Sequence, residues 1–143
     1  MASNYRNAAD GLVTVLEANI TNLKAFPFPP ASINHFPAAV VLPEPIDTEI
    51  AFGGNSFAAD FRVIFLVSSG DDFSGAQALY DHLDPTQANM SLIAAIRTAS
   101  GKTLNGTVDS CDVTRIENIG KRALWGVDYF GFDAIIRFIK SVS

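Results

Sequence analysis

Apolar and polar residues alternate most regularly over residues 56–69. One side of this segment is apolar throughout, with Phe57, Ala59, Phe61, Val63, Phe65 and Val67. The other side begins with Asp60 and Arg62 and becomes apolar at Ile64 and Leu66. Because side chains of a strand alternate between its faces, the pattern predicts a strand with one fully buried face. Its second face is expected to be covered only near the end of the strand.

Two helices are predicted after this strand. The first spans residues 72–83 and begins at Asp71 or Asp72 as N-cap, because a side-chain carboxylate can accept hydrogen bonds from the first free amides. Its apolar stripe is Phe73, Ala76, Leu79, Tyr80 and Leu83. The second helix is short, begins after Ser91 and ends at Gly101.

Before the long strand, an apolar stripe with helical spacing predicts a helix over residues 4–25. Residues 26–37 contain prolines and phenylalanines in close alternation, which favours an ordered, extended loop over a helix. Residues 38–42 are apolar throughout and predict a strand buried on both faces. Residues 46–52 alternate, and the following Gly53-Gly54-Asn55 predicts a hairpin into the long strand.

The C-terminal part of the chain predicts an antiparallel strand pair. Residues 108–119 have mixed faces, which indicates an edge strand or a subunit contact, and residues 120–122 form a polar tip. The last strand spans residues 125–139. The resulting order α-β-β-β-α-α-β-β predicts an α+β fold, a single domain over residues 1–143 with a mostly antiparallel sheet and helices packed on one face.

Composition indicates that other chains cover part of the surface. Of the 143 residues 48% are hydrophobic and only 17% are charged, and 11 are phenylalanine. A soluble monomer needs polar surface, so a charge-poor chain favours assembly into a larger structure. The net charge of −5 argues against a surface that binds nucleic acid. One cysteine excludes an intrachain disulfide, and we expect neither a signal peptide nor a membrane-spanning helix.

No catalytic or metal-binding constellation is evident, so we expect no enzyme activity, metal or cofactor. His35 and His82 have no second ligand at the spacing that metal sites use. Cys111 has no basic neighbour in sequence that would activate its thiol. Gly101-Lys102-Thr103 matches the end of a phosphate-binding loop, but the upstream glycine and the strand-loop-helix order are missing.

Five stretches in a particular order and spacing carry a family resemblance. They are an N-terminal helix before a proline-containing loop, PAAVVLPEPID (37–47), FRVIFLVSSGDD (61–72) followed by AQALYDHLD, SLIAAIRTA followed by TLNGTVDSCDVT, and YFGFDAIIRFI (129–139). In these stretches the chain resembles the tail terminator (neck) proteins of long-tailed phages, particularly those of actinobacterial siphophages, and the terminator of phage lambda. The run FPFPP departs from the family in its content of Phe and Pro.

The resemblance implies a structural virion protein that is assembled in the host cytoplasm. Such proteins form a hexameric ring that caps the finished tail tube, ends its polymerisation and joins it to the head-side stopper, or connector, protein. Their expected partners are copies of the same chain, the tail tube protein, the stopper and the tape measure protein. Genomic DNA passes through the ring without specific binding, which suits an acidic chain, and no membrane is involved.

Contact residues of such a ring are expected in the proline-rich loop, at the hairpin turn, on the polar half of the long strand and around the polar tip. We expect the polar half of the long strand to extend beyond the sheet as a hairpin arm towards a neighbouring subunit or the tube. The predicted interface residues are Phe26, Phe28, Ile33, Phe36, Gly53, Asn55, Phe57, Asp60, Arg62, Lys121, Arg122 and Trp125. Two alternatives remain: another neck protein, such as a stopper or head-completion protein, and a small α+β hydrolase or ligand-binding domain.

Overall fold

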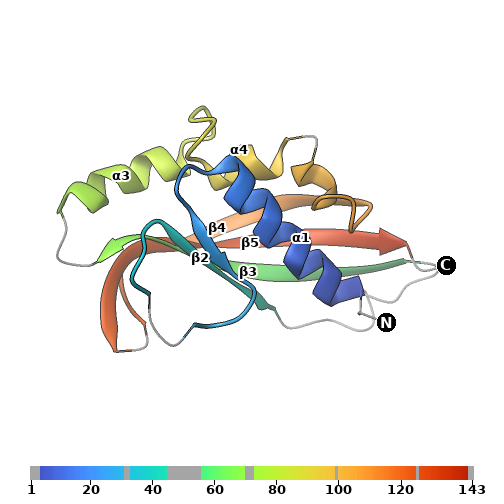
Figure 1. Cartoon of the computed structure of the whole chain (residues 1–143), viewed down its shortest axis with the longest axis horizontal. Helices are drawn as coiled ribbons and strands as arrows, with labels where there is room; N and C mark the ends of the chain where they lie inside the picture. The colour runs from blue at the N-terminus through green and yellow to red at the C-terminus, as the bar shows by residue number, and fades with distance from the viewer. Residues whose placement is uncertain are drawn as a thin grey trace.

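The computed structural model describes residues 4–30, 33–44, 56–69, 73–98, 100–124 and 126–141. In chain order the elements are α1 (Asn4–Asn19), β1 (Lys24–Phe26), β2 (Ala38–Pro43), β3 (Ser56–Ser69), α3 (Phe73–Leu83), α4 (Leu92–Ile96), the 3-10 turn η1 (Gly101–Thr103), β4 (Ser110–Leu124) and β5 (Val127–Ser141) (Figure 1). The predicted α+β class and mostly antiparallel sheet are confirmed, and the order of helices and strands agrees, although β1 overlaps the end of the predicted N-terminal helix. The predicted strand 46–52, the turn 53–55 and the caps Asp71 and Asp72 lie outside the described residues.

The described strands form one five-stranded sheet in the order β1-β2-β3-β5-β4. β1 pairs parallel with β2, and all other neighbours are antiparallel. The long strand β3 is central and pairs with β5 from Ser56 opposite Ser141 to Ser69 opposite Tyr129. The prediction of an arm beyond the sheet is therefore wrong, because Ser56–Arg62 lies within this ladder.

The helices cover one face of the sheet, where the larger core lies (Figure 1). Phe61 of β3 stacks on Phe138 of β5, and Phe65 stacks on Phe132, each pair with ring centroids 5.0 Å apart. All four rings are buried, and each buried phenylalanine stabilises the fold by roughly 1.5–3 kcal/mol. The predicted alternation of β3 is confirmed, since Ala59, Phe61, Val63, Phe65 and Val67 all face this core.

The opposite face of the sheet carries none of the helices that the structure describes, and we call it the helix-free face. The described residues cover only part of its area. A smaller apolar cluster lies there, formed by Ile33, Ala38, Val40, Ile64, Leu66 and Tyr129, with Phe26, Phe36, Leu42 and Leu124 at its margin. The proline-rich loop thus packs on its own sheet through Ile33 and Phe36. This confirms the prediction that the second face of the long strand becomes buried towards its end.

The β4–β5 hairpin curves away from the helical layer (Figure 1). Pairing shifts register between Leu66 and Ser68 on β3 and between Glu117 and Gly120 on β4, and such bulges bend a strand. At Gly131 of β5 a Cβ atom would lie 2.1 Å from the carbonyl oxygen of Phe65. Only glycine permits this close approach, so the residue is required where the sheet bends.

The N-terminal helix ends earlier than its apolar stripe predicts. α1 ends at Asn19, whose side chain donates to the carbonyl oxygen of Val15 over 2.8 Å. Asn22 then adopts a left-handed conformation with φ 61°, which turns the chain into β1. Local periodicity cannot reveal this change, because Lys24–Phe26 is extended through its pairing with residues 38–40.

Four further expectations need correction. The prediction of a polar hairpin tip at residues 120–122 is wrong, because these residues lie inside β4 and the hairpin turn follows Leu124. Gly101 does not end α4, whose C-cap is Arg97, but begins η1. Tyr80 is exposed instead of lying in the core stripe of α3. Strict alternation over residues 108–119 predicts Ile116 on the face opposite Cys111 and Val113, but a bulge between Val113 and Arg115 reverses the facing of β4, so that Ile116 packs in the core with both.

Candidate functional site

Buried titratable side chains of the helical layer are held in structural hydrogen bonds. His82 of α3 packs on Phe65 with a ring-centroid distance of 5.0 Å, and its Nδ1–H donates to the carbonyl oxygen of Met90 over 2.7 Å. Burial lowers the pKa of His82, an effect that the Met90 carbonyl and Asp81 oppose. The imidazole is therefore neutral near pH 7 and ties α3 to the loop before α4.

His35 and Cys111 are held in similar local contacts. The Nε2–H of His35 donates to the carbonyl oxygen of Asn22. The Cys111 thiol donates to the carbonyl oxygen of Gly101 over 3.1 Å, and burial raises its pKa to about 11. Such a thiol is a poor nucleophile at neutral pH. Among the described residues, no group of three His, Cys, Asp or Glu side chains is placed to hold a metal ion.

A charged network on the helix-free face is the most developed polar structure of the described chain. Its centre is Asp133 of β5, only 2% exposed, although it carries a carboxylate in an apolar strand. Asp133 accepts hydrogen bonds from Arg62 over 2.6 Å, from Asn118 over 2.9 Å and from Arg122. A buried carboxylate without such donors would be strongly unfavourable, so the network stabilises the position of all three strands.

The network extends outward through Arg62. This guanidinium also pairs with Glu44, which follows β2, and with Glu117 of β4 over 2.7 Å. Hydrogen bonds to Glu44, Glu117 and Asp133 raise the pKa of Arg62, so it is charged at neutral pH. Arg62 thus joins four neighbouring segments of the sheet.

Beyond this network lies an open trough of about 540 Å³. It occupies the part of the helix-free face that the proline-rich loop does not cover. Two further ion pairs line it: Arg137 donates to Asp60 over 3.0 Å, and Arg115 lies 3.5 Å from Glu117. The trough is lined by Glu44, Asp60, Arg62, Thr114, Arg115, Glu117, Ile135 and Arg137. Charges of both signs on a fixed sheet suit contact with another protein surface.

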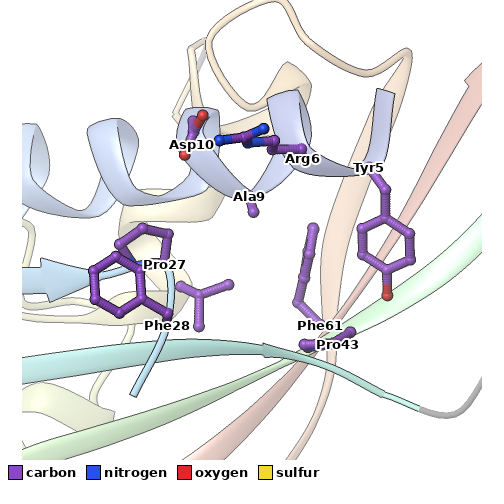
Figure 2. Close-up of a pocket in the computed structure, with 9 residues that line it drawn as sticks. Tyr5, Arg6, Ala9, Asp10, Pro27, Phe28, Pro43 and Phe61 are labelled. Atoms are coloured by element: carbon purple, nitrogen blue, oxygen red, sulfur yellow. The ribbon is translucent and has the colours of Figure 1, made fainter. Parts of the chain in front are cut away.

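A second hollow, of about 440 Å³, lies between α1 and the sheet (Figure 2). Figure 2 shows Tyr5 at one end and Pro27 with Phe28 at the other, with Phe61 and Pro43 between them. Tyr5 donates to the carbonyl oxygen of Asp60 over 2.9 Å, and burial together with nearby Asp60 and Glu44 raises its pKa to about 12. The groove is apolar apart from Arg6 and Asp10 on α1 and contains no acid–base pair of catalytic form.

The predicted interface residues lie in different environments. Phe26, Ile33 and Phe36 pack on their own sheet, whereas Phe28 is 61% exposed. Asp60, Arg62 and Arg122 take part in the ion pairs of the helix-free face. Lys121 is exposed and lies 3.9 Å from Asp128. Gly53, Asn55, Trp125 and the side chain of Phe57 lie outside the described residues.

Sequence reasoning missed the central role of Asp133 and the exposure of Tyr80. A single acidic residue inside the apolar segment FGFDAII was the available signal for Asp133, since an acid within a buried strand requires partners. Its partners Arg62 and Arg122 could not be assigned, because they depend on strand order and on the bulge in β4. The spacing of Tyr80 in the sequence was compatible with the core side of α3 as well as with its exposed side.

No protein-family model and no curated protein sequence matches this chain. None of the helices that the structure describes is long and apolar enough to cross a membrane.

Proposed function

We propose that the protein is a structural component of a phage tail, a tail terminator that forms a ring on the tail tube, ends tube polymerisation and joins the tail to the head-side connector. The family resemblance of the five sequence stretches is the origin of this proposal. Its hexameric ring, virion location and partners, namely the tube protein, the stopper and the tape measure protein, are part of the same proposal.

The observation that carries the proposal is the network of ion pairs on the helix-free face, which the described residues cover only in part. Ion pairs around Asp133 and Arg62 hold its side chains in place before any partner binds. A ring closes at a fixed number of subunits only when the contact surfaces keep a fixed angle, so preorganised side chains on a sheet suit this task. The low proportion of charged residues, 17%, agrees with a chain that buries surface in an assembly.

Mixing experiments distinguish a terminator from another neck protein. The full chain is incubated separately with purified tail tubes and with DNA-filled heads, and both samples are examined by negative-stain electron microscopy. A terminator caps one end of the tubes and leaves isolated heads unchanged. Occupation of the head portal with no binding to tubes would support a stopper or head-completion protein instead. Binding to neither particle would contradict the proposal.

A further inference from the structure

The outer face of α3 carries an aromatic and acidic stripe. Leu79 and His82 face the core, so the residues exposed on the other side are Gln77, Tyr80, Asp81 and Asp84, spaced as on one side of a helix. Tyr80 is 75% exposed, more than any other large apolar side chain of the described chain. A tyrosine in this position exposes a large apolar ring that its own subunit does not use.

Among the described residues, no cationic side chain pairs with the two carboxylates of this stripe. Asp84 accepts hydrogen bonds from the amide and hydroxyl of Thr86, over 2.9 and 2.8 Å, which lower its pKa and keep it ionised. Neither Asp81 nor Asp84 forms an ion pair within the part of the chain that the structure describes. Their charge is therefore available to a partner.

On the helix-free face the arginines of two ion pairs are more exposed than their acidic partners, although acids and bases are equal in number in the trough. Arg137 is 51% exposed and its partner Asp60 only 24%. Arg115 is 61% exposed and its partner Glu117 only 28%. In both pairs the guanidinium is the more exposed partner. A partner that approaches this face consequently meets two arginines first.

These two surfaces are chemically complementary. A guanidinium stacks on an aromatic ring and pairs with a carboxylate, so Tyr80, Asp81 and Asp84 provide the groups that Arg115 and Arg137 can bind.

Direct pairing of strand edges between two copies is disfavoured. β1 has only three residues, and β4 carries two irregularities in register together with charged side chains, features that protect exposed edges.

We propose that copies of this chain associate head to tail, with the α3 stripe of one copy on the Arg115 and Arg137 surface of the next. The inference rests on the proposed function, because it assigns the two surfaces through which a ring would close. Since the surfaces belong to different layers of the fold, the contact is heterologous and can continue from copy to copy.

A charge exchange between two variants tests the inference. Variant one carries Asp81→Lys with Asp84→Lys, and variant two carries Arg115→Glu with Arg137→Glu. In either variant alone like charges meet, so the apparent Kd of self-association, measured by sedimentation velocity, should rise at least tenfold. In an equimolar mixture every contact again joins opposite charges, and association should return as an alternating assembly with an even number of subunits.

Tyr80→Ala provides a second test that leaves every ion pair intact, and it should also weaken association at least tenfold. Arg97→Glu is the control, because Arg97, the C-cap of α4, is 57% exposed, forms a comparable 3.5 Å pair with Asp112 and itself belongs to neither surface. Thermal unfolding followed by circular dichroism establishes that each variant is folded. Salt should weaken association of the wild type, as exposed charge pairs are screened.

Several results would overturn the inference: a wild type that stays monomeric, association that Tyr80→Ala leaves unchanged, or a mixture that fails to restore it. Failure of the proposed function is a separate result. If the wild-type protein caps tail tubes but both charge-reversed variants associate as strongly as the wild type, the proposed function stands and this interface is wrong. A protein that associates through these surfaces but does not bind tubes retains the interface and loses the proposed function.

Discussion

Arg62 of β3 and Asp133 of β5 lie 2.6 Å apart, from Nη1 to Oδ2, although 71 residues separate them in sequence. The same carboxylate accepts from Asn118 and Arg122 of β4. One buried acid therefore connects the central strand, its neighbour and the bent hairpin. This connection keeps the helix-free face in a single arrangement.

Replacing Asp133 with alanine should lower the free energy of unfolding by about 3 kcal/mol, because the partly buried guanidinium groups of Arg62 and Arg122 lose the carboxylate with which they pair. Urea unfolding measures the change. The control is Asp128→Ala, which removes an exposed carboxylate 3.9 Å from Lys121 and should cost less than about 1 kcal/mol. Equal losses in the two variants would mean that the network around Asp133 does not stabilise the fold.

Protonation of His82 should destabilise the protein in mild acid. Burial lowers the pKa of His82 in the folded state, whereas in the unfolded chain it is about 6.5. Below that value the unfolded state binds a proton that the folded state resists, so stability is present above pH 6.5 and falls as the pH decreases. The slope from this group is at most about 1.4 kcal/mol per pH unit.

Urea unfolding between pH 7.5 and 5.5 measures this dependence. His82→Gln should flatten the decline, since its amide can still donate to the carbonyl of Met90 but does not titrate. His35→Gln is the control at an exposed histidine. Because this variant retains His82, its stability should decline between pH 7.5 and 5.5 as that of the wild type does. The same decline in wild type and His82→Gln would show that other groups cause it.

The predictability of the fold differs between its two faces. Strict alternation placed the core residues of β3 correctly, because burial on one face leaves a direct period-2 signal. β1 was missed, since a three-residue strand depends on its partner. The polar face was only partly predictable, because the bulge after Val113 moves Arg115 and Glu117 to the side of Asp133. The exposure of Tyr80 depends on how α3 packs.

Two phenylalanines of the proline-rich loop should differ in their effect on stability. Phe36 is half-buried and lies with its ring centroid 5.9 Å from that of Tyr129, so Phe36→Ala should cost about 2 kcal/mol. Phe28 is exposed at the mouth of the groove under α1, and Phe28→Ala should change stability by less than about 0.5 kcal/mol. Urea unfolding of both variants compares them directly. A larger loss for Phe28→Ala would show that the groove, instead of the loop, contributes the main stabilisation there.

Gly131→Ala should unfold or strongly destabilise the protein, because the new methyl group would lie 2.1 Å from the carbonyl oxygen of Phe65 in the backbone of β3. We expect a loss of roughly 3 kcal/mol or more, as for other overpacked sites that force the backbone to move. Gly120→Ala is the comparison: its φ of 124° is unfavourable for alanine, but no atom lies within 4 Å of the added group. Thermal unfolding should place Gly131→Ala well below Gly120→Ala, and a reversed order would contradict the packing at the bend.

The length of growing tail tubes tests the proposed function most directly. Purified tube protein is polymerised with and without the full chain, and tube lengths are measured by negative-stain electron microscopy. We predict that the protein halts elongation and appears as a ring with a central hole at one tube end. Tubes that grow to the same length distribution, with both ends bare, would contradict the proposal.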